Sequence, residues 1–222
     1  MLNNKALLLI GSPKRTGSTS EKLGHLLLKC LHEYGFGSHV EHIGNAIRNN
    51  NLNEVVEKVN ESDIIIISTP LYVDSLPAPL ISFLETYRND HQNKDKMIVG
   101  IVNSGFPEPY HNNTAIENLR IFALQSDLIW SGGFAIGGGG AFNSDDLSTT
   151  KMAKNIVKAF EKAALFLSKR DPIPPEAIKL ASYSLIPRWM YVMFGQIGWI
   201  VPSINYGTTF KLFHKPYAQQ TG

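Results

Sequence analysis

The residues best suited to chemistry lie in one loop, residues 11–20, where serine and threonine hydroxyls occur together with two glycines and two adjacent cations. Hydroxyl groups and backbone N–H groups bind phosphate, and the positive end of a helix that follows such a loop strengthens the attraction. We therefore predict that this loop binds a phosphate monoester or diester. The side chains expected to take part are Ser12, Lys14, Arg15, Ser18, Thr19 and Ser20.

The loop differs from the two best-known nucleotide-binding loops. A Walker A loop has four residues between its glycines and then Lys-Ser or Lys-Thr, whereas here five residues separate Gly11 from Gly17 and Ser18 follows. The G-x-G-x-x-G pattern of dinucleotide-binding folds is also absent from this loop. The alternative to phosphate binding is an ordinary strand-to-helix turn with a good helix cap.

A buried strand and an amphipathic helix must hold the loop. Residues 6–10 are an apolar run with the length and branching of a strand that is buried on both faces. Ser18 and Glu21 have the spacing of a capping box, in which each side chain binds the backbone N–H of the other residue. The helix that follows has one apolar face, and Gly35 can end it. That face consists of Leu23, Leu26, Leu27, Cys30, Leu31 and Tyr34.

The chain then repeats this alternation of strand and helix. Apolar runs predict further strands at residues 38–43, 63–68, 96–103 and 128–136. Helices are expected at residues 49–60, 79–88, 112–127 and 148–169. Five strands alternating with five helices predict an α/β fold with a doubly wound parallel sheet, because crossovers between parallel strands are right-handed.

Distinctive loops follow the strong strands, and in such sheets ligands bind beyond the carboxyl ends of the strands. The loop that begins at Thr69 combines a proline with Tyr72, which suits it to hold the edge and face of a flat heterocycle. Residues 103–107 form a second loop of this kind, with Phe106 in it. The alternative for both aromatic rings is that they anchor their loops on the core. The glycines at 137–140 make a tight connection or let a ligand approach the backbone.

Together these motifs resemble those of the flavodoxin-like NADPH-dependent FMN reductases, which are related to quinone reductases and azoreductases. The matching stretches are GSPKRTGSTSEKL at residues 11–23, STPLYVDSLPAPL at 68–80 and NSGFPE at 103–108. The resemblance covers the chain to about residue 170. It implies a flavodoxin-like five-stranded parallel sheet of order 2-1-3-4-5, with FMN as cofactor and NADPH or NADH as co-substrate.

The resemblance also implies which residues bind FMN, in three groups. The phosphate would be bound by Ser12, Lys14 or Arg15, Ser18, Thr19 and Ser20. The isoalloxazine would be lined by Pro70, Leu71, Tyr72 and Val73, and the site would be closed by Ser104, Gly105 and Phe106.

The implied activity is electron transfer from NADPH or NADH through FMN to a small acceptor, namely a flavin, quinone, azo or nitro compound. FMN carries this chemistry, so no catalytic side chain is predicted. A flavodoxin-type electron carrier would share the FMN site, and a regulator without enzymatic activity would share the fold. The nearly neutral body argues mildly against a carrier, which would favour an acidic docking surface.

Composition limits the remaining choices. The 222 residues, 43% of them hydrophobic, suffice for one domain with an appendage, and a net charge of +2 is too small to argue for nucleic acid. The single cysteine, Cys30, excludes an internal disulfide. His25, His32, His39 and His42 lack partner acids at ligand spacing, so no metal site is predicted. We expect no signal peptide before the first strand, and we expect the protein in the cytoplasm.

We expect residues 1–171 to form the FMN-binding domain and residues 172–222 to form a helical extension rich in aromatic residues. Residues 189–201 are apolar on nearly every side, so a helix there must be buried against another surface. These thirteen residues are too few to cross a membrane. Two-fold dimers are common among enzymes, and we predict that the extension packs on the body or on the partner in a homodimer. An interfacial membrane helix is the alternative.

Overall fold

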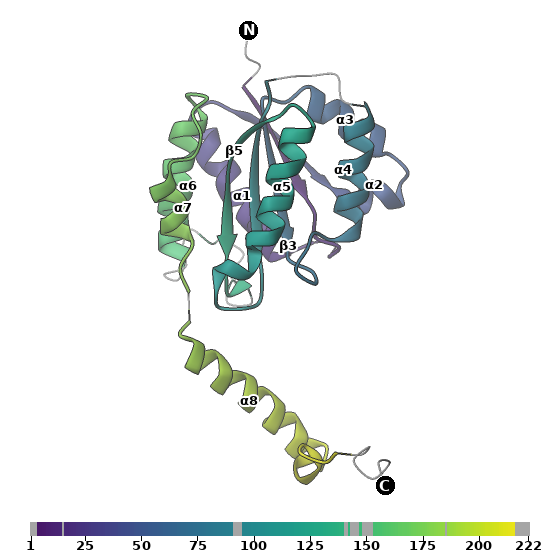
Figure 1. Cartoon of the computed structure of the whole chain (residues 1–222), viewed down its shortest axis with the longest axis vertical. Helices are drawn as coiled ribbons and strands as arrows, with labels where there is room; N and C mark the ends of the chain where they lie inside the picture. Colours follow the sequence, from purple (N-terminus) through teal and green to yellow (C-terminus); the bar gives the residue numbers. More distant parts are fainter. Residues whose placement is uncertain are drawn as a thin grey trace. The chain divides into compact units, whose positions relative to one another are not determined.

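The computed structural model describes residues 4–14, 16–90, 95–139, 142, 147, 153–184 and 186–215 of the chain. The chain forms two compact units, Met1–Leu185, hereafter the body, and Ile186–Gly222. The body contains a parallel sheet with helices on both faces (Figure 1). The predicted domain boundary after residue 171 falls inside the body. That residues 1–171 form a separate domain stays a prediction.

The sheet has the predicted strand order. Its five strands are β1 (Lys5–Ile10), β2 (Gly37–His42), β3 (Ile64–Pro70), β4 (Met97–Asn103) and β5 (Ile129–Ile136), each within two residues of its predicted bounds. The order is β2-β1-β3-β4-β5, and all neighbouring strands are parallel. This is the flavodoxin-like arrangement, and strand order reverses between β1 and β3.

Helices cover both faces of the sheet because successive strand residues point to opposite sides. On β1, Ala6, Leu8 and Ile10 pack with one group of helices, and Leu7 and Leu9 pack with the other. The first group is α1 (Thr19–His32), α6 (Lys154–Leu167) and α7 (Pro175–Ala181) (Figure 1). The second group is α2 (Ile43–Arg48), α3 (Leu52–Asn60), α4 (Ala78–Asp90) and α5 (Asn113–Gln125). A short 3₁₀ helix, η1 (Pro109–Asn112), precedes α5.

The helix α2 lies where the sequence predicted none, and α7 falls inside the predicted helical extension, for which no internal bounds were predicted. The backbone N–H of Ile173 donates to the carbonyl of Ser131 on β5 (2.7 Å), and Ala177 and Ala181 of α7 are buried in the core beside α6. The first ten residues of the predicted extension therefore pack on the body. Part of the predicted helix at 148–169, residues 148–152, lies outside the described residues.

The second unit consists mainly of α8 (Arg188–Asn205), which contains the predicted helix at 189–201 and extends it at both ends. A turn and a 3₁₀ helix, η5 (Thr209–Lys211), follow it. Within the described part of the chain, no helix combines the length and the apolar character needed to cross a membrane.

Candidate functional site

The loops after β1, β3 and β4 surround a cavity of about 420 Å³ at the carboxyl ends of these strands. This is the edge of a parallel sheet where ligands bind, next to the point where strand order reverses. The convergence predicted from the sequence is therefore present. The cavity is lined by Ser12, Lys14, Gly17, Ser18, Thr19, Ser20, Lys22, Pro70, Tyr72, Asn103 and Phe142.

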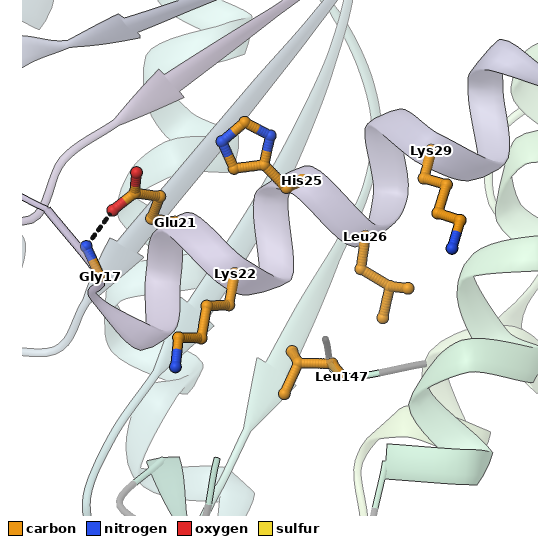
Figure 2. Close-up of a pocket in the computed structure, with 7 residues that line it drawn as sticks. All are labelled: Gly17, Glu21, Lys22, His25, Leu26, Lys29 and Leu147. Atoms are coloured by element: carbon orange, nitrogen blue, oxygen red, sulfur yellow. Dashed lines mark hydrogen bonds between the residues drawn. The ribbon is translucent and has the colours of Figure 1, made fainter. Parts of the chain in front are cut away.

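The first loop is held in place by the predicted capping box. The N–H of Glu21 donates to Ser18 Oγ (3.1 Å), and Glu21 Oε2 accepts from the N–H groups of Gly17 (2.6 Å) and Ser18 (3.4 Å). Figure 2 shows the Glu21 carboxylate turned back toward Gly17 at the start of α1. Gly17 has φ +67°, a conformation that glycine adopts without strain. The carboxylate of Glu21 therefore fixes the path of the loop into α1.

The hydroxyl groups of the loop divide into two pairs according to where their hydrogens go. Thr19 Oγ1 donates to the carbonyl of Gly139 (3.0 Å), and Ser20 Oγ donates to Asn103 Oδ1 (2.7 Å). Ser12 Oγ and Ser18 Oγ instead accept, from the N–H groups of Lys14 (3.3 Å) and Glu21. Because a hydroxyl carries one hydrogen, Ser12 and Ser18 keep theirs available for an anion, whereas Thr19 and Ser20 tie the loop to its neighbours.

Backbone and charge add to these donors. Among the described residues, the N–H groups of Thr19 and Ser20 in the first turn of α1 have no hydrogen-bond acceptor. These N–H groups form part of the positive end of the helix dipole. Lys14 Nζ donates to the carbonyl of Gly17 (3.1 Å), which leaves two ammonium hydrogens. Arg15, predicted as a phosphate ligand, lies outside the described residues. The loop thus presents an anion site of hydroxyl, N–H and ammonium donors.

The second loop brings Pro70 and Tyr72 to the cavity. Tyr72 and Ser75 exchange two backbone hydrogen bonds of 3.0 Å, and Val73 and Asp74 between them have φ values of 48° and 56°. Two central residues with positive φ are typical of a type I′ turn. Val73 stands at its tip, 98% exposed, and does not line the cavity. The backbone N–H of Leu71 donates to the carbonyl of Asn103 (2.8 Å), and its side chain packs against the core.

The third loop approaches the cavity through Asn103, whose neighbour Ser104 is buried. Ser104 Oγ has no hydrogen-bond partner among the described residues. Gly105 is exposed, and the ring of Phe106 is half exposed, with its centroid 4.7 Å from that of His111. Of the three residues predicted to close the site, none lines the cavity directly, although all three lie in the loop that bounds it.

Glycines after β5 support this third loop from behind. The N–H of Gly138 donates to the carbonyl of Phe106 (2.6 Å), and the N–H of Gly139 donates to the carbonyl of Ser104 (2.8 Å). A Cβ at Gly137 would overlap the carbonyl oxygen of Pro107 and lie 2.8 Å from its carbon. The close approach that these glycines allow is therefore between two backbones.

Sequence reasoning missed four residues that line the cavity: Gly17, Lys22, Asn103 and Phe142. Asn103 ends a predicted strand, and strand ends at this edge of a sheet are the signal that identifies it. Lys22 lies one helical turn after Ser18, and its Nζ donates to the carbonyl of Phe142 (3.5 Å). Phe142 comes from a loop distant in sequence, and no local pattern identifies it.

Positive charge continues along α1 beyond the loop. A second cavity of about 380 Å³ shares Gly17 and Lys22 with the first and adds His25 and Lys29. Figure 2 shows the side chains of Lys22 and Leu26 directed to the same side of α1 as Leu147. The carboxylate of Glu21 lines this second cavity as well, so its lining holds charges of both signs.

Two potentially nucleophilic side chains of the body lie away from the cavity. Burial raises the pKa of the Cys30 thiol and of the Tyr87 hydroxyl to about 12, and neither residue lines the cavity. A thiol with that pKa is poorly suited to act as a nucleophile, because the thiolate is the reactive form. Among the described residues, no cluster of three histidine, cysteine, aspartate or glutamate side chains could hold a metal ion.

Comparison with known proteins adds a family to this geometry. The family model described as NADPH-dependent FMN reductase matches residues 4–123, which contain β1 to β4 and all three loops on these strands. No curated protein matches the chain in sequence.

Solved structures share the fold at low sequence identity. An NADH:FMN oxidoreductase (EMOB) in its apo form is 18% identical, with a TM-score of 0.61, over 84% of this chain and 98% of that chain. An FMN-dependent NADH-azoreductase from Bacillus anthracis, in complex with FMN, is 14% identical, with a TM-score of 0.55, over 74% and 99%. An NAD(P)H:quinone oxidoreductase from Methanothermobacter marburgensis is 15% identical, with a TM-score of 0.54, over 73% and 95%.

Proposed function

Because the chain belongs to the NADPH-dependent FMN reductase family, we propose that the cavity at the ends of β1, β3 and β4 is its FMN site. The protein is an FMN-dependent NAD(P)H oxidoreductase. The observation that carries the site assignment is that donors suited to a phosphate, in residues 12–20, and the ring of Tyr72 line one and the same cavity. A phosphate at one end and a flat heterocycle at the other are the two parts of FMN that a protein must recognise.

The residues present fit the phosphate of FMN. Ser12 and Ser18 would donate their hydroxyl hydrogens, Thr19 and Ser20 their backbone N–H groups, and Lys14 an ammonium hydrogen. Hydrogen bonds to charged groups contribute about 1.5–3 kcal/mol each. The side chains of Thr19 and Ser20 would support the phosphate site indirectly, because their hydrogen bonds hold the loop against Gly139 and Asn103. Arg15 remains a proposed phosphate ligand from the family resemblance.

The isoalloxazine would lie between the second and third loops. Pro70 and Tyr72 already line the cavity, and Leu71, Val73, Gly105 and Phe106 belong to the two loops that bound it. Ser104 Oγ, buried and without an acceptor or donor among the described residues, is a polar group of the kind that a heterocycle edge satisfies.

When bound, FMN accepts hydride from NADPH or NADH and passes the electrons to the second substrate. The residues of this chain bind and orient the cofactor, and the rings of Tyr72 and Phe106, both 48% exposed, leave space for a planar substrate beside the cavity. We propose a small acceptor, namely a flavin, quinone, azo or nitro compound, and NADPH as the nucleotide that the family name indicates.

The direct test is the colour of the purified protein and its reduction. We expect a yellow protein that releases FMN on heat denaturation, and whose flavin absorbance is bleached by NADPH or NADH under anaerobic conditions. A quinone or an azo dye should then restore the colour, with ping-pong kinetics, because both substrates use one flavin in turn. A protein that takes up FMN but is reduced only by a low-potential protein donor would instead be an electron carrier, and failure to quench FMN fluorescence would contradict the site.

We further propose that the enzyme is a cytoplasmic homodimer that associates through the groove between α4 and α5. This groove, of about 250 Å³, is lined by Leu76, Leu84 and Phe122, and Leu124 of α5 is 58% exposed. Glu85 and Arg88 line the same groove, and opposite charges on one surface are complementary to each other across a two-fold axis. Ser75, which also lines it, pairs with Tyr72, so a partner there would border the flavin site.

The oligomeric state follows from a mass measurement. Light scattering should give twice the 24.7 kDa of one chain, and Leu124→Glu should lower the mass toward one chain because it places a charge in the interface. Asp127→Asn, in the exposed turn that follows α5, changes the charge by one unit at a position whose positive φ asparagine tolerates, and it is the control for a change of charge alone. A single-chain mass for the unaltered protein would rule out the dimer.

A further inference from the structure

The second unit exposes more large apolar side chains than a free helix can leave in water. In α8, only Ser203 is buried, while Trp189 is 66% exposed, Ile197 47% and Ile204 61%. Contiguous apolar patches of this kind mark surfaces that are covered by a partner or a membrane. The second unit therefore needs a covering surface.

Five of the large apolar side chains form a strip along one side of α8. Trp189, Met193, Ile197, Ile200 and Ile204 follow one another at spacings of three or four residues, so they share one side of the helix. The side away from the strip is mixed: it holds Arg188 and Gly195 together with the rings of Tyr191 and Trp199. Amphipathic rings of this kind lie at a boundary between water and an apolar phase, so the strip can be buried there while Arg188 stays in water.

The charge of the unit indicates which boundary this is. Residues 186–222 contain no aspartate or glutamate, and the described cations Arg188, Lys211 and Lys215 lie at the two ends of the apolar strip. Anionic lipid headgroups attract such flanking cations. Trp189, Trp199 and Tyr206 add the residue types that collect at the interface between lipid and water.

The turn after α8 extends the same surface. Thr208 N donates to the carbonyl of Ser203 (2.8 Å), and Ser203 Oγ contacts Thr209 Oγ1 (3.2 Å), so the chain folds back against the end of the helix. Phe210 and Phe213 are then 100% and 92% exposed, on either side of Lys211. Exposed phenylalanines are suited to the acyl boundary of a lipid surface, and a lysine beside them is suited to its headgroups.

We propose that residues 188–215 form an interfacial anchor that binds an anionic lipid surface, with α8 parallel to the membrane plane. The apolar strip lies in the acyl boundary, and Arg188, Lys211 and Lys215 contact the headgroups. The proposal does not depend on the flavin activity, because it concerns only the second unit.

Flotation of the full-length protein with lipid vesicles tests this anchor. The protein should float with vesicles of phosphatidylcholine and phosphatidylserine, and much less with phosphatidylcholine alone. Raising the salt concentration should release it, because screening weakens the attraction of the cations. Tryptophan emission should shift to shorter wavelength on binding, since Trp189 and Trp199 leave water.

Two neighbouring substitutions distinguish binding through the strip from a general effect of added negative charge. Ile197→Glu places a carboxylate in the strip and should lower the bound fraction at least tenfold. Gly195→Glu makes the same change of charge on the side of α8 away from the strip, where no atom lies within 4 Å of the new Cβ, and should lower it by less than threefold. Circular dichroism on both variants checks that the fold is retained.

The competing prediction is that a second copy of the chain covers α8. In that case the protein would not float, and Ile197→Glu would lower its mass in lipid-free solution. Absence of flotation with anionic vesicles overturns the anchor, whatever the mass. Flotation that Ile197→Glu leaves unchanged overturns it as well, because the strip would then not be the contact.

Discussion

Replacing Ser18 by aspartate should weaken FMN binding by at least a hundredfold while the protein stays folded. Aspartate caps a helix as well as serine does, so the hydrogen bond from the N–H of Glu21 to residue 18 survives the change. The substitution removes one hydroxyl donor and puts a negative charge beside the phosphate. Two like charges about 4 Å apart repel by about 4 kcal/mol near a protein surface, which corresponds to roughly a thousandfold in affinity.

The measurement is quenching of FMN fluorescence on titration, with thermal unfolding as the check on the fold. Riboflavin, which lacks the phosphate, should bind the variant and the unaltered protein about equally. Ser18→Asn, which keeps a neutral cap, is the matched control and should cost much less than Ser18→Asp. An FMN affinity for Ser18→Asp within threefold of the original would show that the phosphate lies elsewhere.

Replacing Gly137 by alanine should destabilise the body by about 2–3 kcal/mol and weaken FMN binding more than tenfold. The added Cβ would overlap the carbonyl oxygen of Pro107 and would lie 3.0 Å from that of Phe106. These are backbone atoms and cannot rotate away, so the two loops must separate. The hydrogen bonds from Gly138 to Phe106 and from Gly139 to Ser104 would then lengthen, and the wall beside Asn103 would open.

Urea unfolding and FMN titration on the same preparation check both effects. Gly105→Ala is the matched control, because it adds the same methyl group to the same wall where no atom lies within 4 Å of the new Cβ. The control should change the free energy of unfolding by less than about 0.5 kcal/mol. Equal effects of the two substitutions would mean that the contact between the loops does not shape the site.

The sheet could be predicted because its strands are buried on both faces, so apolar runs such as residues 64–67 stand out in the sequence. The short helix α2 could not be predicted, because it buries only Ile43 and Ala46, too few apolar positions for a helical period to be visible. The helix α7 falls inside the expected helical extension, and it begins at Pro175 because proline is favoured at the first position of a helix.

The phosphate loop could be predicted from local spacing, since the capping box joins residues three apart. The roles of its hydroxyls could not. Ser20 is tied to Asn103 and Thr19 to Gly139, residues 83 and 120 positions away. The exposure of Val73, whose contact with the isoalloxazine stays a prediction, likewise depends on the turn that Tyr72 and Ser75 close.

The contact of Glu21 with Gly17 and Ser18 also determines when the entropy of the loop is lost. Its carboxylate occupies two N–H groups that would otherwise be held by water, so the path into α1 is fixed as the protein folds. Ordering a loop at the moment of binding subtracts from affinity, whereas a loop ordered beforehand does not. The cost of shaping the anion site is therefore borne by the stability of the apoprotein, and the full attraction between the loop and a phosphate remains for holding the cofactor.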